Sequence, residues 1–363
     1  MNITPQPALA LYSQPAAMTA AGRYAPLLEN LPGDIPSLAA ITHGLLIHEH
    51  MAHGYGVTLT REDRSSVHIR PVEQMLTQVL ARDSRPLQIA RPPADRLPVN
   101  CRHFTVLMTA MLRAHGTPAR ARCGFGGYFG TGKFEDHWVC EYWNAAQQRW
   151  VLVDAQVDKR QRDWFNVDFD VTDVPRDRFL TGGRAWTRYR SGTADPAMFG
   201  LTMTNEAGVW WIAANLMRDA AALRNIEVLP WDCWGAMPGP EDEINSELTL
   251  LFDHLAALTE TPDASHAELD RFCQDDERLR IPSAVRSAAR KPRRASMPGS
   301  AGGMNHTTAR APCGGTSRRP RHLRRNGAGL IRVAPASAGH PSTPDHLDLR
   351  LSSRKRRKSR GGA

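Results

Sequence analysis

A cysteine at the start of an expected helix is the residue of this sequence best suited to nucleophilic chemistry. Asn100 is a favourable N-cap, and the apolar residues after Cys101 recur at helical spacing until Gly116 and Pro118 end the pattern. The free N–H groups and the positive dipole end of a helix N-terminus favour a thiolate. The same groups could receive the oxyanion that forms when a thiolate adds to a carbonyl. A single cysteine on an apolar helical face is, however, most often a small buried residue.

A thiolate nucleophile needs a base, and His137 is the candidate, with Asp154 to orient it. Both residues lie in segments that alternate polar and apolar side chains, which indicates two strands of a hairpin. We centre the turn between Ala145 and Ala146, so that His137 lies directly opposite Asp154. Cross-strand neighbours have Cβ atoms about 5 Å apart, close enough for an imidazole to bond a carboxylate. The register alone therefore predicts this contact.

In the expected triad Cys101 is the nucleophile, His137 the general acid/base and Asp154 the residue that fixes the imidazole tautomer. Asp158 is the fallback for the orienting carboxylate. His103 lies about 200° around the helix from Cys101 and cannot face the same way. The alternative interpretation of the strand residues is a surface pair with a modest ion contact.

The stretch GYFGTGKF, residues 127–134, has the spacing of a phosphate-binding loop. A working loop of that kind has a Ser or Thr after the lysine and leads into a helix. Here Phe134 follows Lys133, and the next residues have strand periodicity. We therefore expect a glycine-rich connection between two strands.

An expected helix over residues 35–51 and the turn after it carry four histidines: His43, His48, His50 and His53. The zinc signature H-E-x-x-H is missed, because the fourth residue after His48 is Ala52. His50 and His53 could meet on one helical face, but no acidic or cysteine ligand completes a set. We therefore expect ordinary surface or core histidines, with neither a metal nor a cofactor.

The remaining elements predict an α+β fold, in which helices precede an antiparallel sheet and return after it. The expected helices are 71–82, the one that begins at Cys101, 206–225, 241–259 and 265–275, and the expected strands are 119–125, 136–143 and 149–155. Residues 157–177 are expected to be mostly loop. The aromatic stretch WDCWG, residues 231–235, is expected to pack the helical region.

Charge is divided unevenly along the 363 residues, although the formal net charge is +9. Residues 283–363 contain 19 Lys and Arg against two acidic residues, a net +17, which leaves −8 for the remainder. This tail has no aromatic residue except histidine and little to bury, so we expect it to be disordered. The cluster RKRRKSR, residues 354–360, could bind nucleic acid, but we favour a solvated coil or an out-of-frame extension, because no aromatic residues interleave with the charges.

The sequence lacks the patterns typical of secreted and membrane proteins. Six cysteines occur without a C-x-x-C pair, the N-terminus has no basic region before its short apolar run, and no apolar run approaches 18 residues. These features favour a soluble protein of the reducing cytoplasm without membrane contact. We expect four segments: a flexible arm at 1–33, a catalytic core at 34–200, a helical lobe packed on it at 201–282, and the disordered tail at 283–363.

Three stretches together resemble the transglutaminase-like superfamily: NCRHFTVLMTAMLRAHGTPARARCGF, DHWVCEYW and RWVLVDAQVD. In that superfamily a helix-start cysteine precedes a Gly-x-Pro-Ala-Arg turn, here residues 116–120, and then a strand histidine and a strand aspartate. The separations of 36 residues from Cys101 to His137 and 17 to Asp154 suit this order. The resemblance covers about residues 70–160.

This resemblance implies a papain-like α+β core and cysteine-dependent chemistry on a peptide or protein amide. Hydrolysis, deamidation and acyl transfer to an amine, each through a thioester, all remain open. The implied roles are nucleophile for Cys101, general acid/base for His137 and orienter for Asp154. The alternative is a catalytically inactive binding protein of the same superfamily, recruited to nucleic acid by its basic tail. Arg102 and His103 depart from the smaller or acidic residues that usually follow the cysteine.

Overall fold

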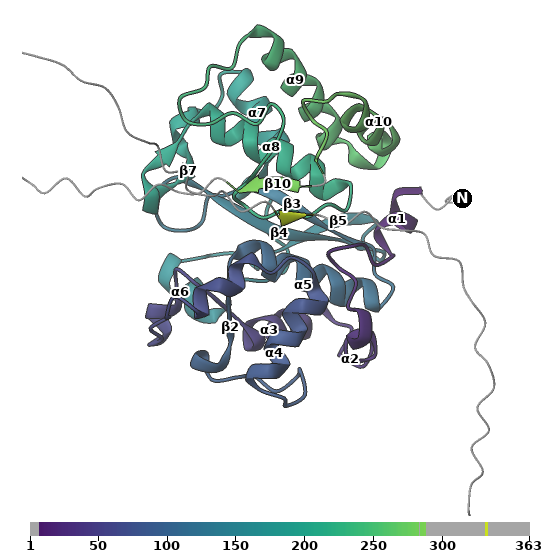
Figure 1. Cartoon of the computed structure of the whole chain (residues 1–363), viewed down its shortest axis with the longest axis vertical. Coiled ribbons are helices and arrows are strands. Elements are labelled where there is room, and N and C mark those ends of the chain that lie inside the picture. Colours follow the sequence, from purple (N-terminus) through teal and green to yellow (C-terminus); the bar gives the residue numbers. More distant parts are fainter. Residues whose placement is uncertain (1–6, 283, 288–330, 333–363) are drawn as a thin grey trace, which may run out of the picture. The chain divides into compact units, whose positions relative to one another are not determined.

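The computed structural model describes residues 7–282, 284–287 and 331–332 (Figure 1). Its helices are α1 Pro7–Tyr12, α2 Ala25–Glu29, α3 Ile35–Leu45, α4 Val72–Arg82, α5 Cys101–Ala114, α6 Lys159–Phe165, α7 Gly182–Arg190, α8 Val209–Leu223, α9 Ser246–Glu260 and α10 Pro262–Asp275. Its strands are β1 Leu46–His48, β2 Leu97–Val99, β3 Ala119–Gly126, β4 Phe134–Asn144, β5 Arg149–Val153, β6 Phe179–Thr181, β7 Phe199–Leu201, β8 Glu206–Ala207, β9 Asp232–Cys233, β10 Ala284–Ser287 and β11 Ile331–Arg332.

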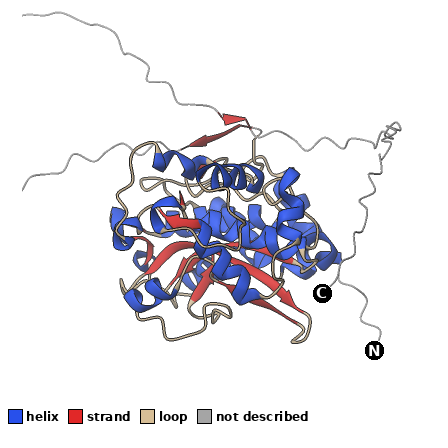
Figure 2. Ribbon diagram, turned by 90° about the horizontal axis from the view of Figure 1, so that it is seen from below, coloured by secondary structure: helices blue, strands red, loops and turns tan. Residues whose placement is uncertain are grey.

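The central sheet is mixed and has the strand order β6-β3-β4-β7-β8, with β5 also paired to β4. β3, β4 and β5 are antiparallel neighbours, whereas β7 runs parallel to the start of β4. Helices α3, α4 and α5 lie on one side of these strands and α7 to α10 on the other, so that helices surround the sheet (Figures 1 and 2). The predicted α+β class is therefore confirmed.

Helix α5 begins where the sequence predicts it. The Asn100 side chain accepts a hydrogen bond from the N–H of Arg102, which satisfies one of the free donors of the first turn. The helix ends at Ala114, just before Gly116, whose φ of +72° suits a residue without a side chain. Every residue from Cys101 to Arg113 is buried, so α5 lies in the interior between the sheet and the helices around it.

Three expectations of local structure are wrong. The helix expected over 35–51 ends at Leu45, because the next three residues form β1, which pairs in parallel with the distant β2. The expected loop at 157–177 contains α6, which Asp158 caps by accepting a bond from the N–H of Gln161. The described part of the arm expected at 1–33 is packed: Tyr12 is 0% exposed, and its hydroxyl donates to the Leu223 carbonyl at 2.7 Å.

The tail expected at 283–363, with its basic cluster at 354–360, lies outside the described residues, except for β10 and β11. The segment boundaries at 200 and 282 stay predictions. Within the described ranges, no helix is both long and apolar enough to cross a membrane.

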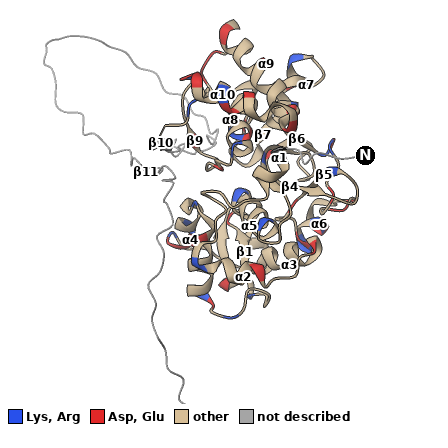
Figure 3. Cartoon of the chain, turned by 90° about the vertical axis from the view of Figure 1, so that its right-hand side faces the viewer, with Lys and Arg blue, Asp and Glu red and all other residues tan. Residues whose placement is uncertain are grey.

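A buried group of ions joins the sheet to α8. The Glu141 carboxylate accepts hydrogen bonds from Arg120 Nε at 2.6 Å and Arg122 Nη1 at 3.0 Å, and Arg122 also bonds Asp219 of α8. Burial opposes ionisation of Glu141, but the charges of Arg120, Arg122 and Arg176 outweigh it and hold its pKa well below the ordinary value. Other charged residues are spread over both groups of helices (Figure 3). The described chain thus keeps a carboxylate ionised inside its core.

We predict that Glu141→Gln lowers the free energy of unfolding by about 3 kcal/mol, because it removes the carboxylate that two buried arginines share and leaves each of them with a single carboxylate partner. Urea unfolding of the wild type and the variant measures this difference. Glu243→Gln, at an exposed position, is the matched control and should change stability by less than about 0.5 kcal/mol. Equal effects of the two substitutions would contradict the role given to Glu141.

Candidate active site

The thiol of Cys101 lies at the N-terminus of α5, where β2 leads into the helix. The side chain is 8% exposed. The N–H of Arg102 donates to the Asn100 side chain and the N–H of His103 to the Asn100 carbonyl, so the cap uses these two donors. The N–H of Cys101 itself is the donor left for an oxyanion beside the sulfur.

His137 and Asp154 are in direct contact. His137 lies in β4, and its Nε2 bonds Asp154 Oδ2 at 2.9 Å. Asp154 is the first residue after β5, and both side chains are almost completely buried, 2% and 0% exposed. The contact predicted from the hairpin is therefore present.

The register that predicted this contact is wrong by two residues. The structure pairs Cys140 with Val153 and Trp143 with Trp150. The turn is therefore Ala145–Gln148, and its centre lies one residue later than the predicted centre between Ala145 and Ala146. A shift of two residues keeps the same side chains on the same face of the sheet. His137 and Asp154 are consequently diagonal neighbours instead of opposite ones, and the imidazole is long enough to reach.

The Cys101 thiol completes the group, because it is near enough to the His137 ring to contribute to the pKa of the imidazole. Since Nε2 of the ring bonds Asp154, Nδ1 is the nitrogen left for the sulfur. Burial lowers the pKa of His137, but the charge and hydrogen bond of Asp154, together with Cys101, raise it to about 10. Burial likewise raises the pKa of Asp154, and His137 more than offsets it, so that the pKa is lowered. The pair therefore exists as imidazolium and carboxylate.

Tyr128 is a site residue that the sequence did not indicate. Its hydroxyl donates to Asp154 Oδ2 at 2.7 Å, and burial together with the Asp154 charge raises its pKa well above the ordinary value, so it remains a donor. Asp154 Oδ1 accepts from the N–H groups of Gln156 and Val157. Both carboxylate oxygens are thus held by hydrogen bonds, two of them from the backbone.

The loop after β3 brings aromatic rings over the imidazole. The ring centroids of Phe129 and Tyr128 lie 4.9 and 6.1 Å from that of His137, and Phe179 lies at 6.4 Å. The loop continues through Gly130 and Gly132, both with φ of +71°, directly into β4. The stretch GYFGTGKF is therefore a connection between strands, as predicted, and it covers the site. A distant contact of this kind leaves no periodic signal in the sequence.

The competing residues have other partners. His103 is buried, with Nδ1 on the Asn100 side chain and Nε2 on the Ile69 carbonyl. Arg102 is buried and donates to the Glu227 carbonyl, while Asp158, the fallback orienter, caps α6.

Over the described residues, no group of three or more His, Cys, Asp or Glu side chains is arranged to hold a metal ion.

Comparison with known proteins agrees with the resemblance drawn from the sequence. Residues 85–155 match the family model described as the transglutaminase-like superfamily, and this segment contains all three predicted residues. A solved structure from Cytophaga hutchinsonii, described as a "Putative Cysteine Protease", aligns with 16% identity over 50% of this chain and 47% of that chain, with a TM-score of 0.28. The alignment thus spans about half of that protein's length. No relative was found among curated proteins. The resemblance is confirmed for the matched segment.

We predict that the imidazole of His137 stays protonated up to about pH 10 and that Asp154→Asn lowers its pKa, because the largest contribution that offsets burial is removed and only the smaller one of Cys101 remains. NMR titration of the histidine ring signals, assigned with a His137→Gln variant, measures both values. Asp163→Asn, which changes an exposed aspartate, is the control. A value near 6.5 in both wild type and Asp154→Asn would contradict the ion pair.

The same shift predicts a pH dependence of stability. Because the folded-state pKa lies above the ordinary 6.5, the contribution of the ion pair is fully present below about pH 6.5 and is lost as the pH rises through about 10. Urea unfolding from pH 6.5 to 10 should therefore show a decline that Asp154→Asn reduces. An identical pH dependence in the variant would contradict this linkage.

We predict that Tyr128→Phe lowers the free energy of unfolding by about 2 kcal/mol, since it removes a buried donor to a charged acceptor. Tyr24→Phe, which removes a part-buried hydroxyl bonded to Thr77 and Arg23 but to no carboxylate, is the matched control and should cost about 1 kcal/mol or less. Denaturant unfolding of both variants measures the difference. If both cost the same, the Tyr128 hydroxyl does not stabilise the Asp154 carboxylate.

Proposed function

With the transglutaminase-like resemblance confirmed for residues 85–155, we propose that the chain is an enzyme that uses Cys101 for covalent chemistry on amide bonds. His137 serves as general acid/base and Asp154 as its orienter. One observation carries the proposal: the buried imidazole bonds the Asp154 carboxylate at 2.9 Å, and the neighbouring Cys101 contributes to the raised pKa of the same ring. Nucleophile, base and orienter in contact are the signature of covalent catalysis.

The geometry supports a two-step reaction. The Cys101 sulfur, with its proton on the imidazole, attacks the amide carbonyl, and the oxyanion forms beside the Cys101 N–H at the positive end of α5. The His137 imidazolium then gives its proton to the departing nitrogen, which leaves as an amine or as ammonia. The acyl group stays on sulfur as a thioester. Water or a second amine, deprotonated by the imidazole, attacks the thioester and restores the thiol.

The identity of the departing and entering groups defines three outcomes. Attack by water on a peptide amide gives hydrolysis, attack by water on a side-chain amide gives deamidation, and attack by an amine gives acyl transfer. The proposed substrate is a peptide or protein amide. The exposed tip of the 127–134 loop, from Gly130 to Gly132, lies next to the rings that cover His137 and belongs to the rim that a substrate would meet.

We predict that the wild-type protein converts members of a mixed peptide library and that Cys101→Ala lowers the rate at least about 10³-fold, since it removes the nucleophile. Mass spectrometry distinguishes cleaved, deamidated and amine-linked products and so identifies the outcome. Cys233→Ala is the matched control, because that cysteine is free, partly exposed and distant in sequence. Product formation that survives in Cys101→Ala would refute the proposed function.

A further inference from the structure

A small polar cavity lies beside the segment that carries Asp154. It has a volume of about 10 Å³, and its lining includes His43 of α3, Tyr55, Phe104 of α5, Gln156 and Gln161. Phe104 is one helical turn from Cys101, and Gln156 is two residues from Asp154. The cavity thus lies next to the candidate active site. A space of this size accommodates one water molecule, provided that polar partners line it.

Two buried acceptors on this lining have no hydrogen-bond partner among the described residues: His43 Nε2 and Gln156 Oε1. The His43 ring bonds the backbone of Ala155, and Nδ1 must make that bond, because Nε2 has no partner. Burial lowers the pKa of His43, so the ring is neutral. Nδ1 therefore carries the proton that it donates to the Ala155 carbonyl, which makes Nε2 an acceptor.

The Gln156 side chain is oriented by its own donors. Its Nε2 donates to Gln161 Oε1 at 3.3 Å and to the Met51 sulfur at 3.7 Å, which fixes Oε1 as the remaining acceptor. The residue is 2% exposed, so bulk water does not satisfy this oxygen. Two acceptors cannot bond each other, and each costs roughly 1–3 kcal/mol if it is left unpaired.

We propose that the cavity binds one water molecule, which donates one hydrogen to His43 Nε2 and the other to Gln156 Oε1, and which thereby holds the segment that presents Asp154 to His137. The Gln156 N–H donates to Asp154 Oδ1 at 2.9 Å. The water and the bond from His43 to Ala155 thus connect α3 to the residues on which the catalytic carboxylate depends. This role rests on the proposed function, whereas the binding of the water does not.

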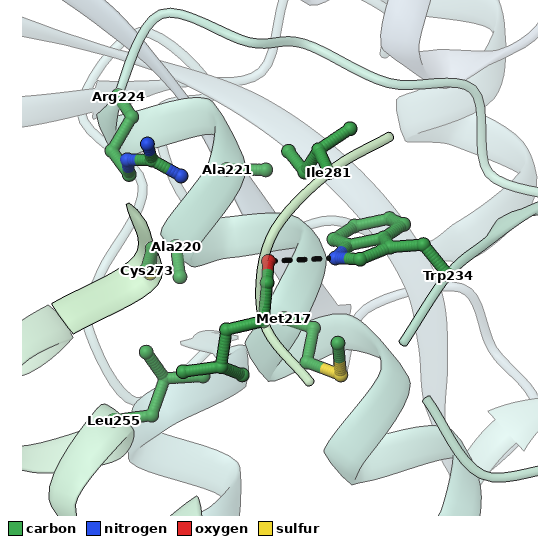
Figure 4. A pocket seen from close by; sticks show the side chains of 9 residues that line it. Met217, Ala220, Ala221, Arg224, Trp234, Leu255, Cys273 and Ile281 are labelled. Atoms are coloured by element: carbon green, nitrogen blue, oxygen red, sulfur yellow. Dashed lines mark hydrogen bonds between the residues drawn. The ribbon is translucent and has the colours of Figure 1, made fainter. Parts of the chain in front are cut away.

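A second cavity of the same volume provides an internal comparison (Figure 4). It lies among α8, α9 and α10 and is lined mainly by apolar side chains, among them Met217, Leu255 and Ile281. Trp234 of the WDCWG stretch closes it as a packed side chain, with Nε1 donating to the Leu279 carbonyl at 3.0 Å. Apolar cavities stay dry, so polarity rather than volume distinguishes the two.

A crystal structure at high resolution tests the site directly. We expect one solvent peak within about 2.7–3.2 Å of both His43 Nε2 and Gln156 Oε1, and none in the cavity of Figure 4. The absence of a peak between these atoms, or equal occupancy of both cavities, would overturn the proposal. This result is independent of catalytic activity.

The positioning role is tested with His43→Leu, which removes both the acceptor Nε2 and the bond to Ala155 but no charge, because His43 is neutral. The pKa of His137, measured by NMR, should fall by about one unit, a tenfold change in proton affinity, as Asp154 loses its fixed position. His53→Leu, at an exposed histidine, is the matched control, and Gln156→Met removes the other acceptor should His43→Leu fail to fold. An unchanged pKa in these folded variants would overturn the positioning role even if the water is present.

Discussion

The hydrogen bond between His137 and Asp154 is the interaction on which the rest of the site depends. Each side chain is buried, and burial alone would make each one neutral. Together they are ionised, because each supplies the charge that the other lacks. The protein maintains this state by giving both carboxylate oxygens further donors, from Tyr128 and from the backbone. An imidazolium held in this way can stabilise a neighbouring thiolate. It can later donate a proton to a departing nitrogen.

Strand β4 serves both the site and the stability of the sheet. His137 and Glu141 are four residues apart on it, so they lie on the same face. The first contacts Asp154 after β5, and the second accepts from two arginines of β3, of which Arg122 also bonds Asp219 of α8. Ion pairs to neighbouring elements therefore fix the strand at two points along its length. The catalytic role proposed for the imidazole requires such a rigid support.

Local signals allowed the sequence to predict much of this arrangement. Asn100 and the helical periodicity after Cys101 define α5 without help from distant residues, and alternation defines β3, β4 and β5. The pairing register depends on turn geometry, and the positive φ of Gln148 in a four-residue turn is not evident from its residue type. Because the register differs from the prediction by two residues, His137 and Asp154 stay on the same face of the sheet, and the predicted contact between them is present. β1 and Tyr128 escaped prediction because each depends on a partner far along the chain.

The central claim is that the surroundings of Cys101 activate its sulfur, and competition among the thiols of the folded protein for a small alkylating reagent tests it most directly. Cys233 is the informative reference, because it is more exposed than Cys101 but lies outside the triad. Peptide mapping after brief treatment at neutral pH should find Cys101 modified at least about tenfold faster than Cys233. This advantage should disappear in His137→Gln. Modification of Cys101 no faster than that of Cys233 in the wild-type protein would contradict the account.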